Sequence, residues 1–118
     1  MRNILRDNLT FRLNGRLWVE TDAERFMGIG RLELLTHIQE QGSISKAAQQ
    51  MGMSYKRAWD LVSSLNAQAA RPLVLTQTGG KSGGGAEVTT EGQQLVQEFR
   101  ALQERFQEFL RTEAARLL

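Results

Sequence analysis

Apolar residues in the middle of the chain follow two helical patterns, which a glycine separates. Steps of three and four residues, the spacing of one helix face, connect the apolar positions of the first pattern: Ile44, Ala47, Ala48 and Met51. The second pattern has an inner stripe of similar spacing: Ala58, Leu61, Val62 and Leu65. Gly52 lies between them and readily adopts the left-handed conformation at which a helix ends and the chain turns. Residues 42–66 are therefore predicted to form two helices joined by a tight turn.

Polar side chains lie on the outer side of the second helix, where it begins: Tyr55, Lys56, Arg57 and Asp60. Ser54 can cap this helix, and either Ser43 or Ser45 can cap the preceding one. Two such helices are typical of a helix-turn-helix, whose second helix lies in the major groove of DNA with its first turns at the base edges. Because helical hairpins that bind no DNA share this pattern, the segment that follows decides between the two interpretations.

A glycine-rich stretch follows the helices. Pro72 closes the helical part, and two short β-prone runs, residues 73–76 and 86–89, flank the stretch at residues 77–85. A strand, a flexible tip and a second strand directly after a recognition helix form the wing of a winged helix. We expect Lys81 at the tip to contact phosphate, and the glycines to let backbone N–H groups approach the duplex closely.

The GGKS sequence in this stretch also suggests a nucleotide-binding phosphate loop. That motif needs a glycine at position 75, where this chain has Leu75, and a helix that begins at its lysine. Glycines and a β-prone run follow Lys81 instead. The wing is therefore favoured over a phosphate loop, and a plain loop without function is the remaining alternative.

Alternating apolar and polar residues at positions 9–20 indicate a strand near the start of the chain. The Asn-Gly pair at residues 14–15 is a strong signal for a two-residue hairpin, which would place Phe11 opposite Trp18. Alternatively the strand continues and turns at residues 21–24. The sequence leaves both alternatives open, and either one gives a small sheet packed on the helices.

The first long helix is predicted to begin near Gly30 and to end at Gly42. A capping-box pattern, Thr21-x-x-Glu24, suggests an earlier start, but Gly28 and Gly30 would each cost about 0.5–1 kcal/mol in a helix interior. The core stripe of this helix is predicted to be Leu32, Leu35 and Ile38. Three consecutive helices result, near residues 30–41, 43–51 and 54–68.

The last segment, residues 91–118, is predicted to be one long helix that Thr89 and Thr90 introduce, about 40 Å in length. Its apolar residues follow steps of four and three, a heptad seam: Leu95, Phe99, Leu102, Phe106 and Phe109. We expect this seam to pair with a second copy, and the alternative is that the helix packs on its own domain. The predicted division is a DNA-binding domain at residues 1–90 and a dimerisation helix at residues 91–118.

Composition narrows the classes of function. With 118 residues, of which 41% are hydrophobic, the chain can bury one core. It has no cysteine and one histidine, His37, which is typically a helix-surface residue or a core residue with satisfied hydrogen bonds. Because no Cys/His, Ser/His/Asp or multi-histidine metal set can be assembled, we expect no enzyme activity, catalytic residue, metal or cofactor.

The net charge of +2 does not by itself indicate a nucleic-acid partner. Between Lys46 and Lys81, however, five basic residues stand against one acid, Asp60, so the middle third is expected to face an anion. No apolar run approaches the ~20 residues of a membrane span, and no signal-peptide pattern opens the chain. We therefore expect a cytoplasmic protein without a membrane partner.

Two stretches resemble a known family: GSISKAAQQMGMSYKRAWD and TGGKSGGGAEVTTEGQQLV. They are similar to the amino-terminal DNA-binding domain of the ModE family of molybdate-responsive transcription regulators, a winged helix-turn-helix related to the LysR type. The likeness spans roughly residues 13–109. Its most specific parts are SYK-x-AW in the second helix and the glycine-rich wing followed by VT, two residues and a glycine.

The resemblance implies a mainly α (α+β) winged helix-turn-helix with small β elements and a long carboxy-terminal helix. It also implies a homodimer that binds double-stranded DNA at an inverted repeat and controls molybdenum transport or molybdoenzyme genes. The expected DNA contacts are Ser43, Ser45, Lys46, Ser54, Tyr55, Lys56, Arg57, Thr78, Gly80, Lys81 and Ser82. Trp59 is expected to be a packing residue, with a base contact as the alternative. Asp60 is expected to orient Lys56 or Arg57 across one helical turn.

Members of the family also carry a downstream molybdate-binding region, which residues 1–118 do not match. We therefore expect this polypeptide alone to bind DNA with an affinity that molybdate does not change. Three alternatives stay open: a naturally short member that lacks the sensor, one that meets the sensor on a separate chain, or a chain cut at the domain boundary. The alternative from another class is a winged-helix adaptor that binds a protein and shows no specific DNA binding.

Overall fold

The computed structural model describes residues 1–77 and 84–118. These residues form two compact units. One unit is Trp18–Phe99, and the other combines Met1–Leu17 with Arg100–Leu118. Within the described residues, no helix has the length and apolar character that crossing a membrane requires.

Three helices build the Trp18–Phe99 unit: α1 (Ile29–Gln41), α2 (Ile44–Gln50) and α3 (Tyr55–Gln68). Their bounds lie within one or two residues of the predicted ones. The chain turns after α1 at Gly42 and after α2 at Gly52, both left-handed with φ of 67° and 66°. Serine hydroxyls cap the next helices, since Ser43 accepts from the Lys46 amide at 3.2 Å and Ser54 from the Arg57 amide at 3.1 Å. Of the two predicted caps for α2, Ser43 is therefore the one used.

The core of this unit lies where α1 packs against α2, β2 and β4. The largest fully buried side chains are Met27, Leu34, Leu35, Ile38, Leu65 and Val74. The predicted stripe of α1 is confirmed, and Leu34 is buried in addition because neighbours cover α1 on more than one side. His37 is half-buried, and its Nδ1 has no hydrogen-bond partner among the described residues.

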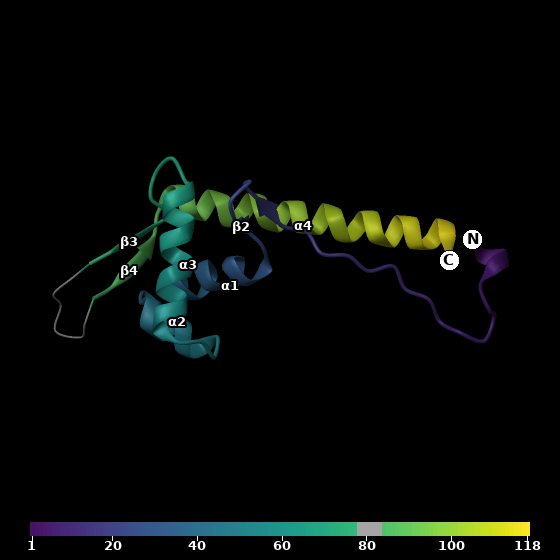
Figure 1. Ribbon diagram of the computed structural model, residues 1–118, viewed down its shortest axis with the longest axis horizontal. Coiled ribbons are helices and arrows are strands. Elements are labelled where there is room, and N and C mark those ends of the chain that lie inside the picture. The colour runs from purple at the N-terminus through teal and green to yellow at the C-terminus, as the bar shows by residue number, and fades with distance from the viewer. Residues whose placement is uncertain (78–83) are drawn as a thin grey trace. The chain divides into compact units, whose positions relative to one another are not determined.

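The predicted wing strands are confirmed as β3 (Val74–Thr76) and β4 (Ala86–Val88), which pair antiparallel in Figure 1. The side chain of Asn66 joins this hairpin to α3: its Oδ1 accepts from the amides of Leu73 at 2.8 Å and Val74 at 3.2 Å. Its Nδ2 donates to the Val74 carbonyl at 3.0 Å. The base of the wing is thereby fixed to the carboxyl end of α3. The tip at residues 78–83 lies outside the described residues.

A short hairpin precedes α1, formed by β1 (Val19–Glu20) and β2 (Arg25–Met27). Its turn at residues 21–24 is closed by the Thr21 amide, which donates to the Glu24 carbonyl at 2.8 Å. This is the second of the two predicted alternatives. The predicted hairpin at residues 14–15 is absent from the structure, so that alternative is wrong, and residues 9–18 form no strand. Gly15 instead packs on a helix, where a Cβ would lie 2.9 Å from Cζ of Phe106.

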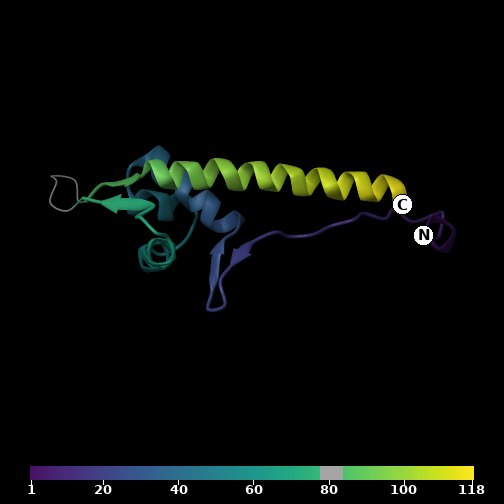
Figure 2. The ribbon, with the colours of Figure 1, turned by 90° about the horizontal axis from the view of Figure 1, so that it is seen from above.

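The long helix α4 (Thr90–Leu117) agrees with the predicted one (Figure 2). Thr89 caps it by accepting from the Gly92 amide at 3.1 Å. Residues of α4 from Arg100 onward form a unit with Met1–Leu17, which begins with a short turn, η1 (Arg2–Ile4). In this unit the Arg2 guanidinium donates to the Ala115 carbonyl. The amino-terminal segment therefore packs along the last turns of α4.

Gly92 should be intolerant of any side chain. In the first turn of α4, a Cβ there would clash with the Leu73 carbonyl oxygen and lie 2.6 Å from Cγ1 of Val88. Because backbone cannot yield as a flexible side chain can, we expect Gly92→Ala to lower the free energy of unfolding by about 1–3 kcal/mol, measured by urea denaturation. Gly30→Ala is the matched control, since its Cβ meets nothing within 4 Å. An unchanged midpoint for Gly92→Ala would contradict this packing.

Candidate nucleic-acid interface

The exposed side of α3 gathers aromatic and basic side chains at its first turns. Ser54 caps the helix, and Tyr55, Lys56 and Arg57 follow it, all exposed. The Lys56 ammonium lies 2.8 Å from a carboxylate oxygen of Asp60, and this hydrogen bond raises the pKa of Lys56. Asp60 thus orients Lys56, one of the two predicted partners. Arg57 makes no ion pair within the described ranges, so its guanidinium is available for a ligand.

Tyr55 and Trp59 stack on this surface, with ring centroids 6.2 Å apart and an interplanar angle of 29°. They are 53% and 42% exposed. The sequence predicts packing for Trp59, and the structure places that packing on the helix surface against Tyr55 rather than in the core. The step of four residues brings the two rings together, and the exposure of Trp59 favours the alternative role of a contact residue.

The predicted contacts outside α3 divide into two groups. On α2, Ser45 and Lys46 are exposed, whereas the Ser43 oxygen already accepts the capping bond. A hydroxyl that accepts in a cap keeps its own O–H as a donor, so Ser43 and Ser54 remain able to bind phosphate. The second group falls in the wing tip, outside the described residues: Thr78, Gly80, Lys81 and Ser82.

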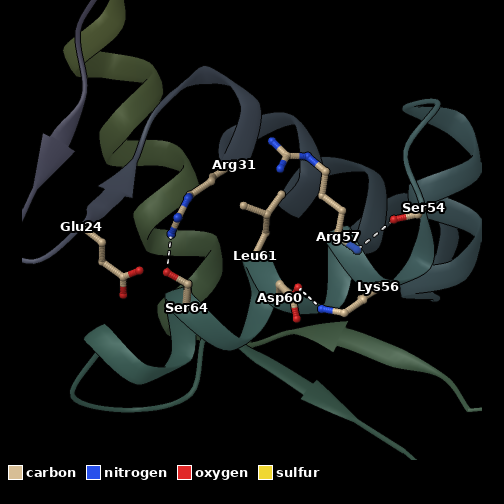
Figure 3. Close-up of a pocket in the computed structure, with 8 residues that line it drawn as sticks. All are labelled: Glu24, Arg31, Ser54, Lys56, Arg57, Asp60, Leu61 and Ser64. Atoms are coloured by element: carbon tan, nitrogen blue, oxygen red, sulfur yellow. Dashed lines mark hydrogen bonds and ion pairs between the residues drawn. The ribbon is translucent and has the colours of Figure 1, made fainter.

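A hollow of about 390 Å³ lies beside α3 (Figure 3). Its lining residues are Glu24, Arg31, Ser54, Lys56, Arg57, Asp60, Leu61 and Ser64. Arg31 is fixed in it, because one guanidinium nitrogen, Nη1, donates to Ser64 Oγ at 2.9 Å and to the Phe26 carbonyl at 3.3 Å. Burial lowers the pKa of Arg31; the charge of Glu24 opposes this effect, and those of Arg25 and Arg57 add to it.

Sequence reasoning missed Arg31, although one signal was available. Arg31 is the third residue of α1, and a cation in the first turn of a helix is disfavoured by the positive end of the helix dipole. An arginine retained at such a position suggests a role other than helix stability.

The predicted seam residues of α4 differ in exposure. Leu95, Leu102 and Phe106 are half-buried, and Phe109 is 57% exposed. Phe99 departs from the expectation, because it is 3% exposed in a single chain and belongs to the core of the Trp18–Phe99 unit. Its large apolar surface is covered without a second copy.

Comparison with known proteins places this arrangement in a family. Residues 29–93, from the start of α1 to the first turn of α4, match the model described as "Bacterial regulatory helix-turn-helix protein, lysR family". A solved structure of a mutant of Lactococcus lactis ZitR aligns over 95% of this chain and 74% of its own, with a TM-score of 0.53 and 15% sequence identity. That likeness shows the fold alone.

Curated relatives confirm the resemblance to ModE. The molybdenum transport protein ModE of Azotobacter vinelandii is 37% identical over 99 residues, 84% of this chain and 37% of that protein. The DNA-binding transcriptional dual regulator ModE of Escherichia coli K12 is 49% identical over 67 residues, 57% of this chain and 26% of that protein. The chain thus spans between about a quarter and just over a third of the length of these relatives. Because the family model matches more than half of this chain, the chain belongs to the lysR family of bacterial regulatory helix-turn-helix proteins.

Proposed function

We propose that this chain binds duplex DNA as a ModE-like transcription regulator, with the first turns of α3 in the major groove. The observation that carries the proposal is the exposed start of α3, where Arg57 has no ion-pair partner within the described ranges and Tyr55 and Lys56 stand beside it. Arginine in this position matches the donor pattern that reads guanine in the major groove.

The roles of the side chains follow from their positions. Tyr55, Lys56 and Arg57 read base edges, with Trp59 stacked on Tyr55 against the groove wall. Ser43, Ser45, Lys46 and Ser54 lie on α2 and at the start of α3, where they bind backbone phosphates. Thr78, Gly80, Lys81 and Ser82 are proposed to contact phosphate or the minor groove from the wing. The name of the Azotobacter vinelandii relative, molybdenum transport protein ModE, favours genes of molybdenum transport as the targets, and the resemblance to the family adds molybdoenzyme genes.

A homodimer is part of the proposal. The unit of Met1–Leu17 and Arg100–Leu118 leaves many large apolar side chains exposed: Met1, Ile4, Leu9, Phe11, Leu13 and Phe109. Exposed large apolar side chains that adjoin one another are typical of an interface. We place the DNA contacts in residues 1–90 and the dimer contacts in residues 91–118, where Phe99 builds the core and Phe109 meets the second copy; the exposed side chains of the amino-terminal segment are the alternative interface.

The salt dependence of binding tests the function. A labelled duplex, selected from a random library by the protein itself, should bind with a log K that falls by about 0.9 per phosphate contact for each tenfold rise in salt. The competing function is a protein-binding adaptor, which the exposed aromatic pair Tyr55 and Trp59 favours, since aromatic residues are enriched in protein interfaces. Failure to select any duplex, or binding indifferent to salt, would favour the adaptor.

A further inference from the structure

Hydrogen bonds within the chain hold Arg31 in place but engage only one of its guanidinium nitrogens. Its two hydrogen bonds, to Ser64 Oγ and the Phe26 carbonyl, both come from Nη1. A guanidinium carries five N–H donors in a rigid fork, so Nη2 and Nε keep donors without a partner among the described residues. Figure 3 shows the side chain extending into the hollow toward Ser64, with Leu61 between it and Arg57. The chain has thus fixed the orientation of this cation without completing its hydrogen bonds.

A second hollow of about 360 Å³ lies beside the first, since Arg31, Arg57 and Leu61 line both. The second hollow adds Arg25 from β2, whose guanidinium carbon lies 4.4 Å from the centroid of the Trp18 ring. The ring face supports the cation without neutralising it. Three guanidiniums, those of Arg25, Arg31 and Arg57, therefore line the second hollow.

The acids around this space do not neutralise the cluster. No ion pair of Arg25, Arg31 or Arg57 occurs within residues 1–77 and 84–118. Asp60 is engaged by Lys56 at 2.8 Å. Glu24 also lines the first hollow, and its charge acts on Arg31 without forming an ion pair among the described residues. Because like charges close together are unfavourable without an opposite charge beside them, the cluster is expected to bind an anion.

We propose that Arg31, together with Arg25, binds a backbone phosphate of the DNA whose bases Arg57 reads. The two arginines belong to α1 and β2, outside the recognition helix, where contacts set the register of a protein on the duplex. A guanidinium fork matches two phosphate oxygens at once. The inference rests on the proposed function and adds to it a phosphate site that fixes how α3 enters the groove.

The test compares Arg31→Gln with wild type on the selected duplex and on a scrambled one, over a range of salt. Loss of a charge-assisted contact should weaken both complexes by about tenfold or more and by the same factor. The slope of log K against log salt should fall by about one. Arg31→Lys keeps the charge and should keep the slope while restoring part of the affinity. Ser64→Ala removes the anchor of Arg31, together with a hydrogen bond from Gln68 Nε2 at 3.1 Å, and should also keep the slope.

Arg116→Gln is the matched control, because it makes the same charge change at a residue that pairs with Glu113 at 3.2 Å and lines neither hollow. Circular dichroism confirms that each variant is folded. If wild type binds the selected duplex and Arg31→Gln does not change the slope of log K against log salt, this inference is overturned and the proposed function is unaffected. Loss of discrimination between the two duplexes would show that Arg31 reads a base. If the wild-type protein bound no duplex, the proposed function itself would be refuted.

A free oxyanion has the same chemistry as a backbone phosphate, and calorimetry with inorganic phosphate separates the two. We expect no tight binding of free phosphate, because a duplex supplies many simultaneous contacts and a single ion does not. Stoichiometric binding of phosphate that Arg31→Gln abolishes, with DNA affinity unchanged, would assign the hollow to a free anion and refute the DNA contact.

Discussion

Replacing Arg57 by alanine should weaken binding to the selected duplex by about 1–3 kcal/mol and relax the preference at one base pair. The side chain is exposed and makes no ion pair within the described ranges, so its removal leaves no partner group unpaired. The cap of α3 survives, since Ser54 accepts from the backbone amide of residue 57 rather than from the side chain. Alanine is also the best helix former, which keeps α3 intact. The loss is therefore expected in recognition and not in folding.

Two further variants separate base reading from phosphate binding. Lys56→Ala should have a smaller effect than Arg57→Ala, because Asp60 already engages the Lys56 ammonium. Lys81→Ala in the wing should weaken all sequences alike and lower the salt slope by about one. Competition binding against a panel of single-base variants of the selected duplex measures both properties. If Lys81→Ala lost discrimination while changes at Tyr55, Lys56 and Arg57 did not, the wing and not α3 would read the sequence.

Local signals in the sequence were sufficient for the helix-turn-helix. Glycines at 42 and 52 take left-handed conformations, and Ser43 and Ser54 make the caps that their positions predict. These features depend on the chemistry of a few adjacent residues, so they can be read without knowledge of distant contacts. The same holds for the wing strands, which a proline and a run of glycines delimit.

The features that the sequence did not predict depend on partners distant along the chain. Arg31 gains its role from Ser64, 33 residues away, and from Arg25 and Arg57. The Asn-Gly pair at residues 14–15 is a strong turn signal, yet this segment packs on α4 near Phe106. Phe99 fits a heptad seam by its spacing, but it is buried within its own unit. Periodicity identifies an apolar face and cannot say what covers it.

Phe109 is therefore the residue at which the dimer should be tested. Of the predicted seam it is the most exposed, at 57%, and burial of such a side chain is worth roughly 1.5–3 kcal/mol. In a two-fold dimer each substitution is present twice, so Phe109→Glu should weaken association by about 3–6 kcal/mol, or about 140- to 20,000-fold in Kd. Sedimentation over a range of protein concentration measures this change.

Phe99→Ala is the contrasting variant, because Phe99 lies in the core. We expect it to lower the free energy of unfolding by about 3–5 kcal/mol and to leave the association of folded chains unchanged. Ile29→Glu, at an exposed apolar residue of the other unit, should leave sedimentation unchanged. A dimer that persists in Phe109→Glu would move the interface to the exposed apolar side chains of the amino-terminal segment, Ile4, Leu9 and Phe11 among them.

The effect of Phe109→Glu on DNA follows from symmetry. Two copies of α3 related by a two-fold axis must meet successive major grooves, so the selected duplex should be an inverted repeat with half-site centres about 34–36 Å apart. A monomeric Phe109→Glu chain should lose tight binding to the full repeat and bind a single half-site as weakly as wild type does. If Phe109→Glu is monomeric and still binds the full repeat with wild-type affinity, the two half-sites are read independently, and the dimer contributes nothing to recognition.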